Sequence, residues 1–526
     1  MHASLQNLGR VLLAAPLIAA AMVAMPSRAA DAVPWTGTWS VTPWTTDDAG
    51  FRNQTIRQIV HTSIGGTAAR IRLSNRFGTQ PVTLGPVYIA LRASEAATVP
   101  GSGRQVLFNG RSTVTIPAGA EVSSDTVAFA VPALSDIAVS LYVPGATAPR
   151  ATGHGGSLQD VYIAPGNAAA DTNMRSVSTN SASGQAYYFL TNVDVQNAAA
   201  TGAVVAFGAS ITDGVASRPN VNLRWTNDLA LRLQQAGMTV GVLNQGISGN
   251  NFFSDGAGQA GRTRFAHDVL QQPGVKWVIV SDDAVNNLNN ANPVPAADLI
   301  AVLKELIAAA HQSNVKFLCS TLTPFHGTPQ WTQAAEESRA QLNAFMKSAN
   351  SGCDAVVDQA LATSDPADRS RYLAQYDAGD SLHPNEAGLQ AIADAVPLTA
   401  LGQPSSLPPV AAPTQCGQLL PGQGLKRGQQ LQSCDGRFGL NLQNDGNLVI
   451  YLGATPLWNT ATQGSSAALL LMRDDGNLVE YDAAGGILWQ SGVHVSASVA
   501  TYLQNDGNFV TYSAGKPVWY TGTCCH

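Results

Sequence analysis

The sequence has few charged residues, and its basic residues form no cluster. Only 12% of the 526 residues are Asp, Glu, Lys or Arg, and the formal net charge is −6 at pH 7. Proteins that hold nucleic acid need clustered Lys and Arg side chains to neutralise phosphates. The composition therefore argues against nucleic acid as a partner.

Long hydrophobic runs are also scarce. The marked one, residues 11–25, follows Arg10, contains Pro16 and precedes small residues. A run of this length with these flanks is typical of a secretory signal and is too short to span a bilayer comfortably. We predict a signal peptide over residues 1–30 rather than a membrane anchor. The mature chain is then expected to have no membrane span and to be secreted, either to the periplasm or outside the cell.

Cysteine is rare, with six in the chain, a number that fits an oxidising, exported setting. No Cys or His cluster has the spacing of metal ligands, so we predict no metal and no other cofactor. Cys319 and Cys353 lie near neighbouring predicted strands and are candidates for a bridge. Cys416 and Cys434 lie near the start of the last predicted domain and the pair 524–525 at its end, which predicts bridges between the two ends.

The length is enough for about three domains. Residues 31–198 contain short apolar or alternating runs between turn signals, which predict an all-β sandwich or jelly roll. The clearest runs are 58–64, 69–74, 112–116 and 137–143.

Residues 199–400 alternate strand and helix patterns, which predicts a parallel sheet with helices on both faces, an α/β/α three-layer domain. The expected strands are 203–207, 239–243, 276–280, 315–320 and 355–357. The clearest helices are 296–310 and 334–348.

Two further regions follow. Residues 401–415 are rich in proline and predict a semi-rigid linker. Residues 416–526 contain three copies of one pattern, beginning at Gln443, Arg473 and Gln504. A tryptophan follows each copy, so we expect a three-fold β architecture in which Trp458, Trp489 and Trp519 fill the axis.

One stretch of the α/β region is suited to nucleophilic chemistry. Residues 203–207 predict a buried strand that ends at Gly208 and delivers Ser210 to the carboxyl end of the sheet. Far downstream, Asp380 and His383 are three residues apart, so the carboxylate can hold the imidazole while its other nitrogen takes the serine proton. Pro384 is expected in the first turn of the helix that follows.

These segments resemble the SGNH (GDSL) esterases and acylhydrolases. The first block of that family corresponds to residues 208–210, the second to 244–250, the third to 281–288, and the fourth to Asp380 with His383. The resemblance implies that Ser210 is the nucleophile, His383 the general base and then acid, and Asp380 the residue that orients it.

The resemblance also implies an oxyanion hole made by the N–H groups of Ser210 and Gly249 and by an asparagine amide. Two departures from the family pattern stand out: Ala209 replaces an aspartate, and the third block lacks its glycine. We assign the amide to Asn286, with Asn287 as second choice.

Other histidines and aromatic residues have more than one interpretation. We expect His311 to be solvated or to interact with the end of its helix, and His326 to face the cleft without acting as the base. The segment 153–156 is not expected to be an oxyanion loop, because it lacks a matching nucleophile elbow. Residues 35–39 and 72–78 resemble the β-domain of one branch of secreted SGNH hydrolases. The tryptophans at 35, 39 and 44 either bind carbohydrate or seal the junction with the next domain.

The three C-terminal copies resemble the Gln-x-Asp-x-Asn-x-Val-x-Tyr motif of bulb-type mannose-binding lectins, which fold as a β-prism. Arg473 replaces the glutamine of the second copy. The carbohydrate-binding residues that the resemblance implies are Gln443, Asp445, Asn447, Val449, Tyr451, Asp475, Asn477, Val479, Tyr481, Gln504, Asp506, Asn508, Val510 and Tyr512.

Together these features predict a secreted serine esterase that hydrolyses acetyl or other short acyl esters on glycans, with a mannose-binding, lectin-like domain that brings it to carbohydrate. Two alternatives remain. The chain could be a lipase or phospholipase of the same mechanism, or a glycan-binding protein whose hydrolase domain is weak or inactive.

Overall fold

The computed structural model describes residues 33–175, 178–179, 186–402, 407, 410–483, 485–493, 495 and 499–525. The predicted signal peptide, residues 1–30, and part of the predicted linker lie outside the described residues. Among the helices of the described part, none is both long enough and apolar enough to cross a membrane.

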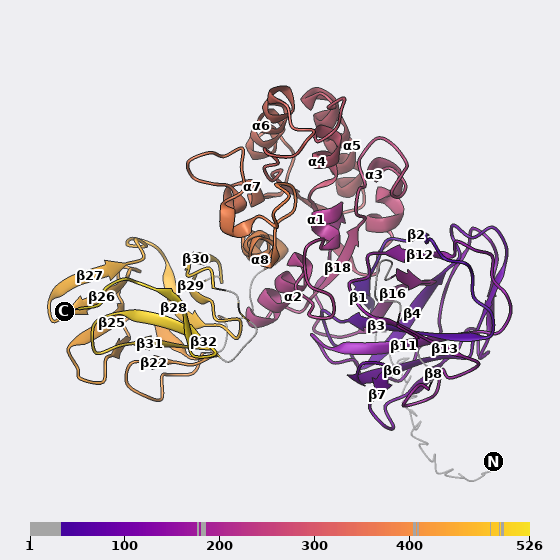
Figure 1. The fold of residues 1–526 in the computed structure, drawn as a ribbon, viewed down its shortest axis with the longest axis horizontal. Helices are drawn as coiled ribbons and strands as arrows, with labels where there is room; N and C mark the ends of the chain where they lie inside the picture. Colours follow the sequence, from indigo (N-terminus) through magenta and orange to yellow (C-terminus); the bar gives the residue numbers. More distant parts are fainter. Residues whose placement is uncertain are drawn as a thin grey trace, which may run out of the picture. The chain divides into compact units, whose positions relative to one another are not determined.

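The first region, up to Gln196, is built from antiparallel strands (Figure 1). A four-stranded sheet and a seven-stranded sheet share one buried core. Strand β3 (Gln54–His61) contributes Ile56 and Val60 to it, and β4 (Ala68–Ser74) contributes Ile71 and Leu73. The four-stranded sheet has the order β1 (Trp35–Ser40), β16 (Leu190–Gln196), β4 (Ala68–Ser74), β10 (Glu121–Ser123). The larger one has the order β14 (Ser178–Thr179), β13 (Val161–Pro165), β3 (Gln54–His61), β11 (Asp136–Val143), β6 (Val87–Ser94), β7 (Ala97–Thr98), with β8 (Arg104–Val106) also paired to β6. Smaller sheets pair β15 (Ala186–Tyr188), β12 (Thr152–Gly155) and β2 (Trp44–Thr45), and β5 (Val82–Leu84) with β9 (Val114–Ile116).

The central region has a five-stranded parallel sheet. Its order is β18 (Val240–Gly246), β17 (Gly202–Gly208), β19 (Val275–Val280), β20 (Lys316–Ser320), β21 (Ala355–Val357). Every residue of β17 is buried, because helices cover both faces of the sheet.

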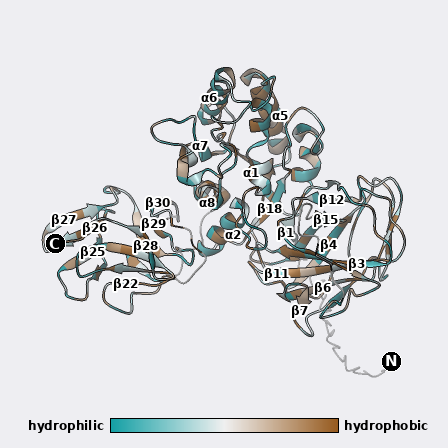
Figure 2. Cartoon of the chain, in the orientation of Figure 1, coloured by the Kyte–Doolittle hydropathy of each residue, from teal (hydrophilic) through white to brown (hydrophobic). Residues whose placement is uncertain are grey.

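Alternation along β17 directs its side chains to two separate cores. Val205 and Phe207 pack in one core with α5 (Ala296–Gln312) and α6 (Gln333–Lys347). Val204 and Ala206 pack in the other with α2 (Trp225–Gln235) and α8 (Glu386–Asp394). The apolar face of α5 is visible as brown ribbon in Figure 2. The shorter helical segments are α1 (Ser210–Asp213), α3 (Gly261–Phe265), η1 (Ala266–Leu270), α4 (Asp283–Leu288), α7 (Gln359–Thr363), η2 (Ala374–Tyr376) and η3 (Leu398–Leu401).

The expected elements of this region are present, with small shifts at their ends. The largest difference concerns the helix after His383. It begins at Glu386, and Asn385 is its N-cap, with the side-chain oxygen accepting the Gly388 N–H. Pro384 therefore precedes the cap instead of lying in the first turn, because asparagine satisfies a free helix N–H that proline cannot.

The last region consists of three four-stranded antiparallel sheets. Each copy of the repeat supplies one of the two central strands of one sheet. The sheets are β22 (Gln418–Leu419), β31 (Val499–Leu503), β32 (Phe509–Ser513), β33 (Lys516–Tyr520); β23 (Gly424–Lys426), β28 (Ala467–Met472), β29 (Leu478–Asp482), β30 (Ile487–Gln490); and β24 (Gln430–Gln432), β25 (Phe438–Leu442), β26 (Leu448–Leu452), β27 (Thr455–Asn459). Trp458, Trp489 and Trp519 meet edge to face, with ring centroids 5.6–6.2 Å apart. The predicted tryptophan axis is thus present.

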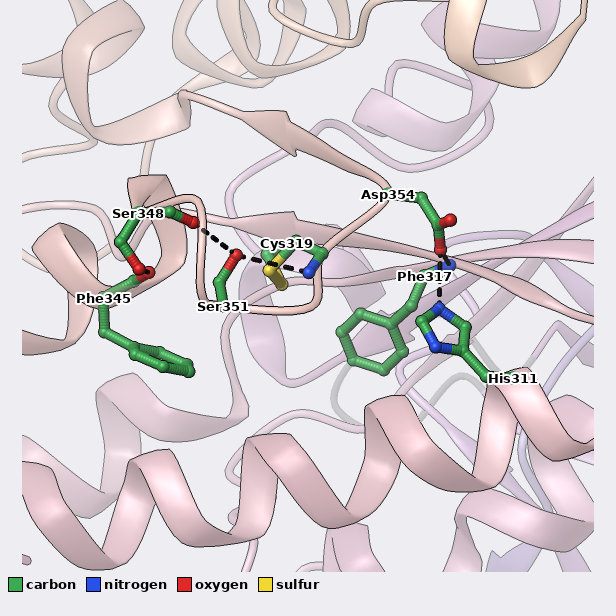
Figure 3. The surroundings of a disulfide bond; sticks show 8 residues. His311, Phe317, Cys319, Phe345, Ser348, Ser351 and Asp354 are labelled. Carbon is green, nitrogen blue, oxygen red and sulfur yellow. Dashed lines mark hydrogen bonds and ion pairs between the residues drawn. A yellow bond between two sulfur atoms is a disulfide. The ribbon is translucent and has the colours of Figure 1, made fainter.

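The structure contains two disulfides. Cys319 in β20 is joined to Cys353, just before β21, as expected (Figure 3). Beside it, the Asp354 carboxylate accepts the Phe317 N–H at 2.7 Å and pairs with His311 Nε2 at 2.8 Å. His311 therefore pairs with a carboxylate next to this bridge.

The second disulfide corrects a prediction. Cys416 is bonded to Cys434, a residue 18 positions away, while Cys524 and Cys525 are free and exposed. The expected bridges between the two ends of the last domain are absent from the described residues. The local loop brings Cys416 and Cys434 to a Cα separation of 5.0 Å, which leaves neither available for the C-terminal pair.

Candidate active site

Ser210 lies where β17 ends and α1 begins. Gly208, the last residue of the strand, has no room for a side chain, because an added Cβ would come within 2.3 Å of the Thr212 and Asp282 side chains. The serine is buried within its turn, with 8% of its surface exposed. It lies at the carboxyl end of a parallel sheet, where α/β proteins place their ligands.

The structure brings together the three residues predicted to act as nucleophile, base and orienting acid. His383 Nε2 lies 3.0 Å from Ser210 Oγ, and His383 Nδ1 lies 2.6 Å from Asp380 Oδ2. With Nδ1 donating to the carboxylate, Nε2 is left to accept the serine proton. The three side chains thus form one continuous hydrogen-bonded chain.

The loop around Asp380 fixes this carboxylate. Its Oδ1 accepts the backbone N–H groups of Leu382 at 2.9 Å and His383 at 2.8 Å. Partial burial alone would raise the pKa of Asp380, but the hydrogen bonds from the His383 side chain and from these two N–H groups outweigh it, and the pKa lies below its usual value. Asp380 therefore stays ionised beside the imidazole over a wide range of pH.

Asp282, in the irregular third block, binds the turn of the first block, in which Ala209 replaces the family's aspartate. Its Oδ1 accepts the Ala209 N–H at 2.9 Å and the Thr212 hydroxyl at 2.6 Å, and its Oδ2 accepts the Ile211 N–H at 2.8 Å. Burial raises the pKa of Asp282, and these hydrogen bonds oppose the rise. The turn that carries Ser210 is therefore held from the segment between β19 and α4.

The second and third blocks lie side by side. Gly249 has φ +80°, a left-handed conformation that favours glycine. Next to it, the Asn250 carbonyl accepts the Asn286 side-chain amide at 2.7 Å. Asn287 is buried, its oxygen accepting the Phe252 N–H at 3.1 Å and its amide donating to Asn251. Asn286 is therefore the more accessible of the two candidates.

Arg264, which the sequence analysis did not single out, joins all three blocks. Its guanidinium donates to Gly208 O at 2.9 Å, Gln245 O at 2.8 Å and Asn250 Oδ1 at 3.0 Å. It also forms ion pairs with Asp268 and Asp283 and lies over the Phe207 ring. Its position 54 residues after Ser210 carries no local signal that would have identified this role.

A second residue missed by sequence reasoning comes from the N-terminal region. His154 in β12 contacts Asp213, three residues after Ser210, with Nε2 3.0 Å from Oδ1. The segment 153–156 thus contacts the helix that begins with Ser210, and the His154 side chain makes the contact. Trp39 also lies at this junction, lining a small cavity with Asp213 and Asn244.

The other tryptophans contact residues of their own region. Trp44 packs against Phe77 at 4.7 Å, and the Arg70 guanidinium lies over Trp35 at 4.7 Å. Of these three tryptophans, Trp39 is the one that lines the junction with the α/β region.

His326 lies beside the loop that carries the base. Its ring stacks on Trp331 at 4.0 Å, while Nδ1 contacts Ser370 Oγ and Nε2 contacts Arg371. Gly327 approaches Ser381 so closely that an added Cβ would meet the serine Oγ at 2.5 Å. Because both ring nitrogens are engaged, His326 is poorly suited to act as a base.

In the last region, the first and third copies share one arrangement. Gln443 Nε2 donates to Tyr451 Oη at 2.8 Å, and Gln504 Nε2 donates to Tyr512 Oη at 3.0 Å. Gln443 and Tyr451 border an open groove of about 710 Å³. Val449 and Val510 are buried, each 3% exposed.

The Asp and Asn positions also make bonds inside the fold. The carboxylate of Asp445 accepts the Asn447 N–H at 3.0 Å, and Asp506 accepts the Asn508 N–H at 2.9 Å. The Asn447 oxygen accepts the Thr462 N–H at 3.2 Å. The asparagine oxygens of these two copies therefore hold the turn that follows each strand.

The second copy is closed. Arg473, Asn477 and Val479 are fully buried and Tyr481 is 2% exposed. The Arg473 guanidinium pairs with Asp475 at 3.0 Å and with Asp394 of α8 at 3.4 Å. In the copy where arginine replaces glutamine, the residues at the Gln, Asn, Val and Tyr positions of the motif are thus buried.

Within the described residues, no group of three or more His, Cys, Asp or Glu side chains is arranged to hold a metal ion.

Comparison with known proteins bears on two regions. Residues 206–391 match the GDSL-like Lipase/Acylhydrolase family. A putative lipolytic protein of the G-D-S-L family from Desulfitobacterium hafniense has a solved structure that is 22% identical, covering 37% of this chain and 97% of that chain, with a TM-score of 0.29.

Lectins form the second group of matches. The B-type lectin plumieribetin from Scorpaena plumieri is 46% identical over 61 residues, which are 12% of this chain and 53% of plumieribetin, so the chain spans about half of that relative's length. The mannose-specific agglutinin from snowdrop (Galanthus nivalis) bulbs, solved with methyl-α-D-mannoside, is 35% identical, covering 21% of this chain and 99% of that chain, with a TM-score of 0.18. Residues 206–391 thus belong to the GDSL-like lipase/acylhydrolase family, and the same chain also carries a part homologous to B-type lectins.

Proposed function

We propose that the chain is a secreted serine esterase that removes acetyl or other short acyl groups from glycans. The observation that carries the proposal is the hydrogen-bonded chain from Ser210 Oγ through the His383 ring to Asp380, with distances of 3.0 and 2.6 Å. This arrangement makes a serine nucleophilic at neutral pH. The family match over residues 206–391 supports hydrolysis as the reaction class.

In the proposed mechanism, Ser210 Oγ attacks the ester carbonyl carbon while its proton passes to His383 Nε2. The N–H groups of Ser210 and Gly249 and the Asn286 amide stabilise the oxyanion. The leaving alcohol takes the proton from the imidazole. His383 then activates a water, which attacks the acyl-enzyme and releases the acid and the free serine.

We assign the lectin-like part to the three sheets between β22 and β33, and we propose that it binds mannose-type carbohydrate. The three repeat copies and the groove beside Gln443 and Tyr451 support this assignment. A glycan-binding module raises the local concentration of ester groups carried on the same polymer. This argument favours a glycan ester over a lipid as substrate.

A disabled hydrolase domain is the main competing interpretation, because the first and third blocks depart from the family pattern. The contacts of Asp282 argue against it, since this carboxylate holds the serine turn despite Ala209. A lipase or phospholipase of the same mechanism is distinguished by a preference for long acyl chains.

Hydrolysis of p-nitrophenyl esters by the purified mature protein tests the proposal. We expect turnover of the acetyl ester to exceed that of the palmitoyl ester and to fall at least 1,000-fold in Ser210→Ala, because the nucleophile is lost. The same substitution in Ser217→Ala is the matched control, because Ser217 is a nearby buried serine whose hydroxyl donates to Gly214 O. Absence of turnover on every ester would reject the esterase in favour of the binding protein.

A further inference from the structure

The N-terminal region reaches the catalytic centre through His154. We propose that His154 is a positioning residue, which acts through Asp213 to hold the Ser248–Gly249 segment of the oxyanion hole. This inference rests on the proposed function, because it concerns the geometry of that reaction.

The first link is the fixed orientation of the imidazole. His154 Nδ1 lies 2.9 Å from the Thr42 carbonyl oxygen, which can only accept, so Nδ1 donates. The opposite nitrogen, Nε2, faces Asp213 Oδ1 at 3.0 Å. Both side chains are 5% exposed, so solvent does little to weaken the contact.

The second link runs from Asp213 to the second block. Its other oxygen, Oδ2, accepts both the Ser248 hydroxyl at 2.6 Å and the Ser248 N–H at 3.1 Å. Ser248 directly precedes Gly249, whose N–H is the proposed oxyanion donor. One carboxylate therefore connects α1, which begins with the nucleophile, to the loop that supplies an oxyanion contact.

The surroundings leave His154 no room to act on substrate directly. The cavity beside it has a volume of about 40 Å³ and is lined by His61, Asn222 and Arg224 among others. Such a volume is close to the space of a single water and far below that of a sugar or an acyl group. The role of His154 is therefore exerted through Asp213.

The end of α1 has a second support, which separates positioning from folding. Arg224 Nε donates to the Asp213 carbonyl at 2.6 Å, and its Nη2 donates to Ser157 O at 2.7 Å. The backbone of Asp213 thus stays attached to the N-terminal region when His154 changes, while its carboxylate loses a partner.

Two amide variants of His154 test the proposal as a matched pair. In His154→Gln the amide nitrogen can occupy the place of Nε2 and keep the donor to Asp213, whereas in His154→Asn it can occupy the place of Nδ1 and keep only the donor to Thr42. We expect His154→Asn to lower kcat on p-nitrophenyl acetate by roughly tenfold to a hundredfold with KM changed less than twofold, because a small displacement of an oxyanion donor slows chemistry without weakening binding. We expect His154→Gln to keep kcat within about threefold of the unchanged protein.

A second measurement does not depend on turnover. Hydrogen exchange of the peptide that contains Ser248 and Gly249 should be faster in His154→Asn than in His154→Gln, since only the former frees the Asp213 carboxylate that holds the Ser248 N–H. Equal kcat and equal exchange in the two variants would overturn the inference. Lack of turnover in the unchanged protein would reject the proposed function alone, and the exchange comparison would still decide the role of His154.

Discussion

Asp282 shows how a departure from a motif can be compensated by a residue elsewhere. Its two oxygens accept from the backbone of Ala209 and Ile211 and from the Thr212 hydroxyl. An asparagine at this position has one acceptor oxygen and would turn its amide toward a donor. The serine turn would lose part of its support, although Ser210 and His383 would remain.

We therefore expect Asp282→Asn to lower kcat on p-nitrophenyl acetate about tenfold, or more if the turn shifts by an ångström. Steady-state kinetics measures this effect. Asp298→Asn, on the exposed face of α5, removes a carboxylate that has no role in the site and is the control. Unchanged kcat in Asp282→Asn would show that the turn holds without this carboxylate.

Arg264 is a second residue whose importance comes from its contacts. Burial raises the pKa of Asp283 from 3.8 to about 6, and the Arg264 guanidinium opposes this rise. Because the pKa of Asp283 is higher in the folded state than in the unfolded state, the contribution of this group to stability is complete below pH 3.8. That contribution is lost as pH rises through 6. Arg264 limits that loss.

We predict that Arg264→Met lowers the free energy of unfolding by about 3–5 kcal/mol at pH 8, because it leaves Asp283 buried without a cation, while Asp268 keeps His267 as a partner. The loss should be smaller at pH 5, where Asp283 is protonated. Urea unfolding at the two pH values measures the difference. The exposed Arg262→Met, in the same helix, is the control, and equal losses at both pH values would contradict the prediction.

At the scale of elements, the tryptophan axis is the clearest feature of the last region. Each ring packs against the other two, so removing one exposes the remaining pair and opens a cavity. We expect Trp519→Ala to destabilise this region by about 3–5 kcal/mol. Thermal unfolding followed by near-ultraviolet circular dichroism measures it. Tyr520→Ala, one position along β33 and 64% exposed, should change little; a similar loss in both would argue against the axis as the source of stability.

The elements that could be predicted from the sequence are those with a local signal. The run 203–207 is apolar at every position and forms the buried strand β17. The three-residue spacing of Asp380 and His383 places them in one turn. Trp458, Trp489 and Trp519 could be predicted to meet because they recur at one place in each copy. In the first two cases the sequence pattern and the structure it predicts lie within a few residues of one another. In the third case the pattern repeats along the chain.

The features that could not be predicted join segments far apart in the chain. His154 meets Asp213 across 59 residues, and Asp282 meets Ala209 across 73. Such pairs depend on how strands are ordered and how regions pack, and a single sequence carries no periodicity that reports either. The closed second copy belongs to the same class, since only the packing around Arg473 shows that its face is covered.

At the scale of the whole molecule, His267 links the central region to the N-terminal sheet. Its Nδ1 lies 2.7 Å from Asp268 and its Nε2 lies 3.0 Å from Glu121 in β10. Burial alone would lower the pKa of His267, but the two carboxylates outweigh it and raise the pKa from 6.5 to about 9. Because the folded-state pKa is the higher one, this contribution to stability is complete below pH 6.5 and is lost as pH rises through 9.

We predict that the free energy of unfolding falls by about 2 kcal/mol between pH 6.5 and 9 through this residue, after allowance for solvent screening. Unfolding by urea across this range measures the slope. His267→Gln should remove that part of the slope, whereas His311→Gln, at the exposed pair with Asp354, should leave it. An unchanged slope in His267→Gln would show that other groups govern alkaline stability.

Burial of the middle copy of the repeat leaves two open copies. Two copies keep the Gln and Tyr pair. Under the proposed carbohydrate binding, a polysaccharide that reached both copies would have to leave two sites before it diffused away. Two linked binding sites commonly give an affinity 10²–10⁴ times higher than one site alone. A free monosaccharide would then be a weak competitor for a long chain that reaches both copies.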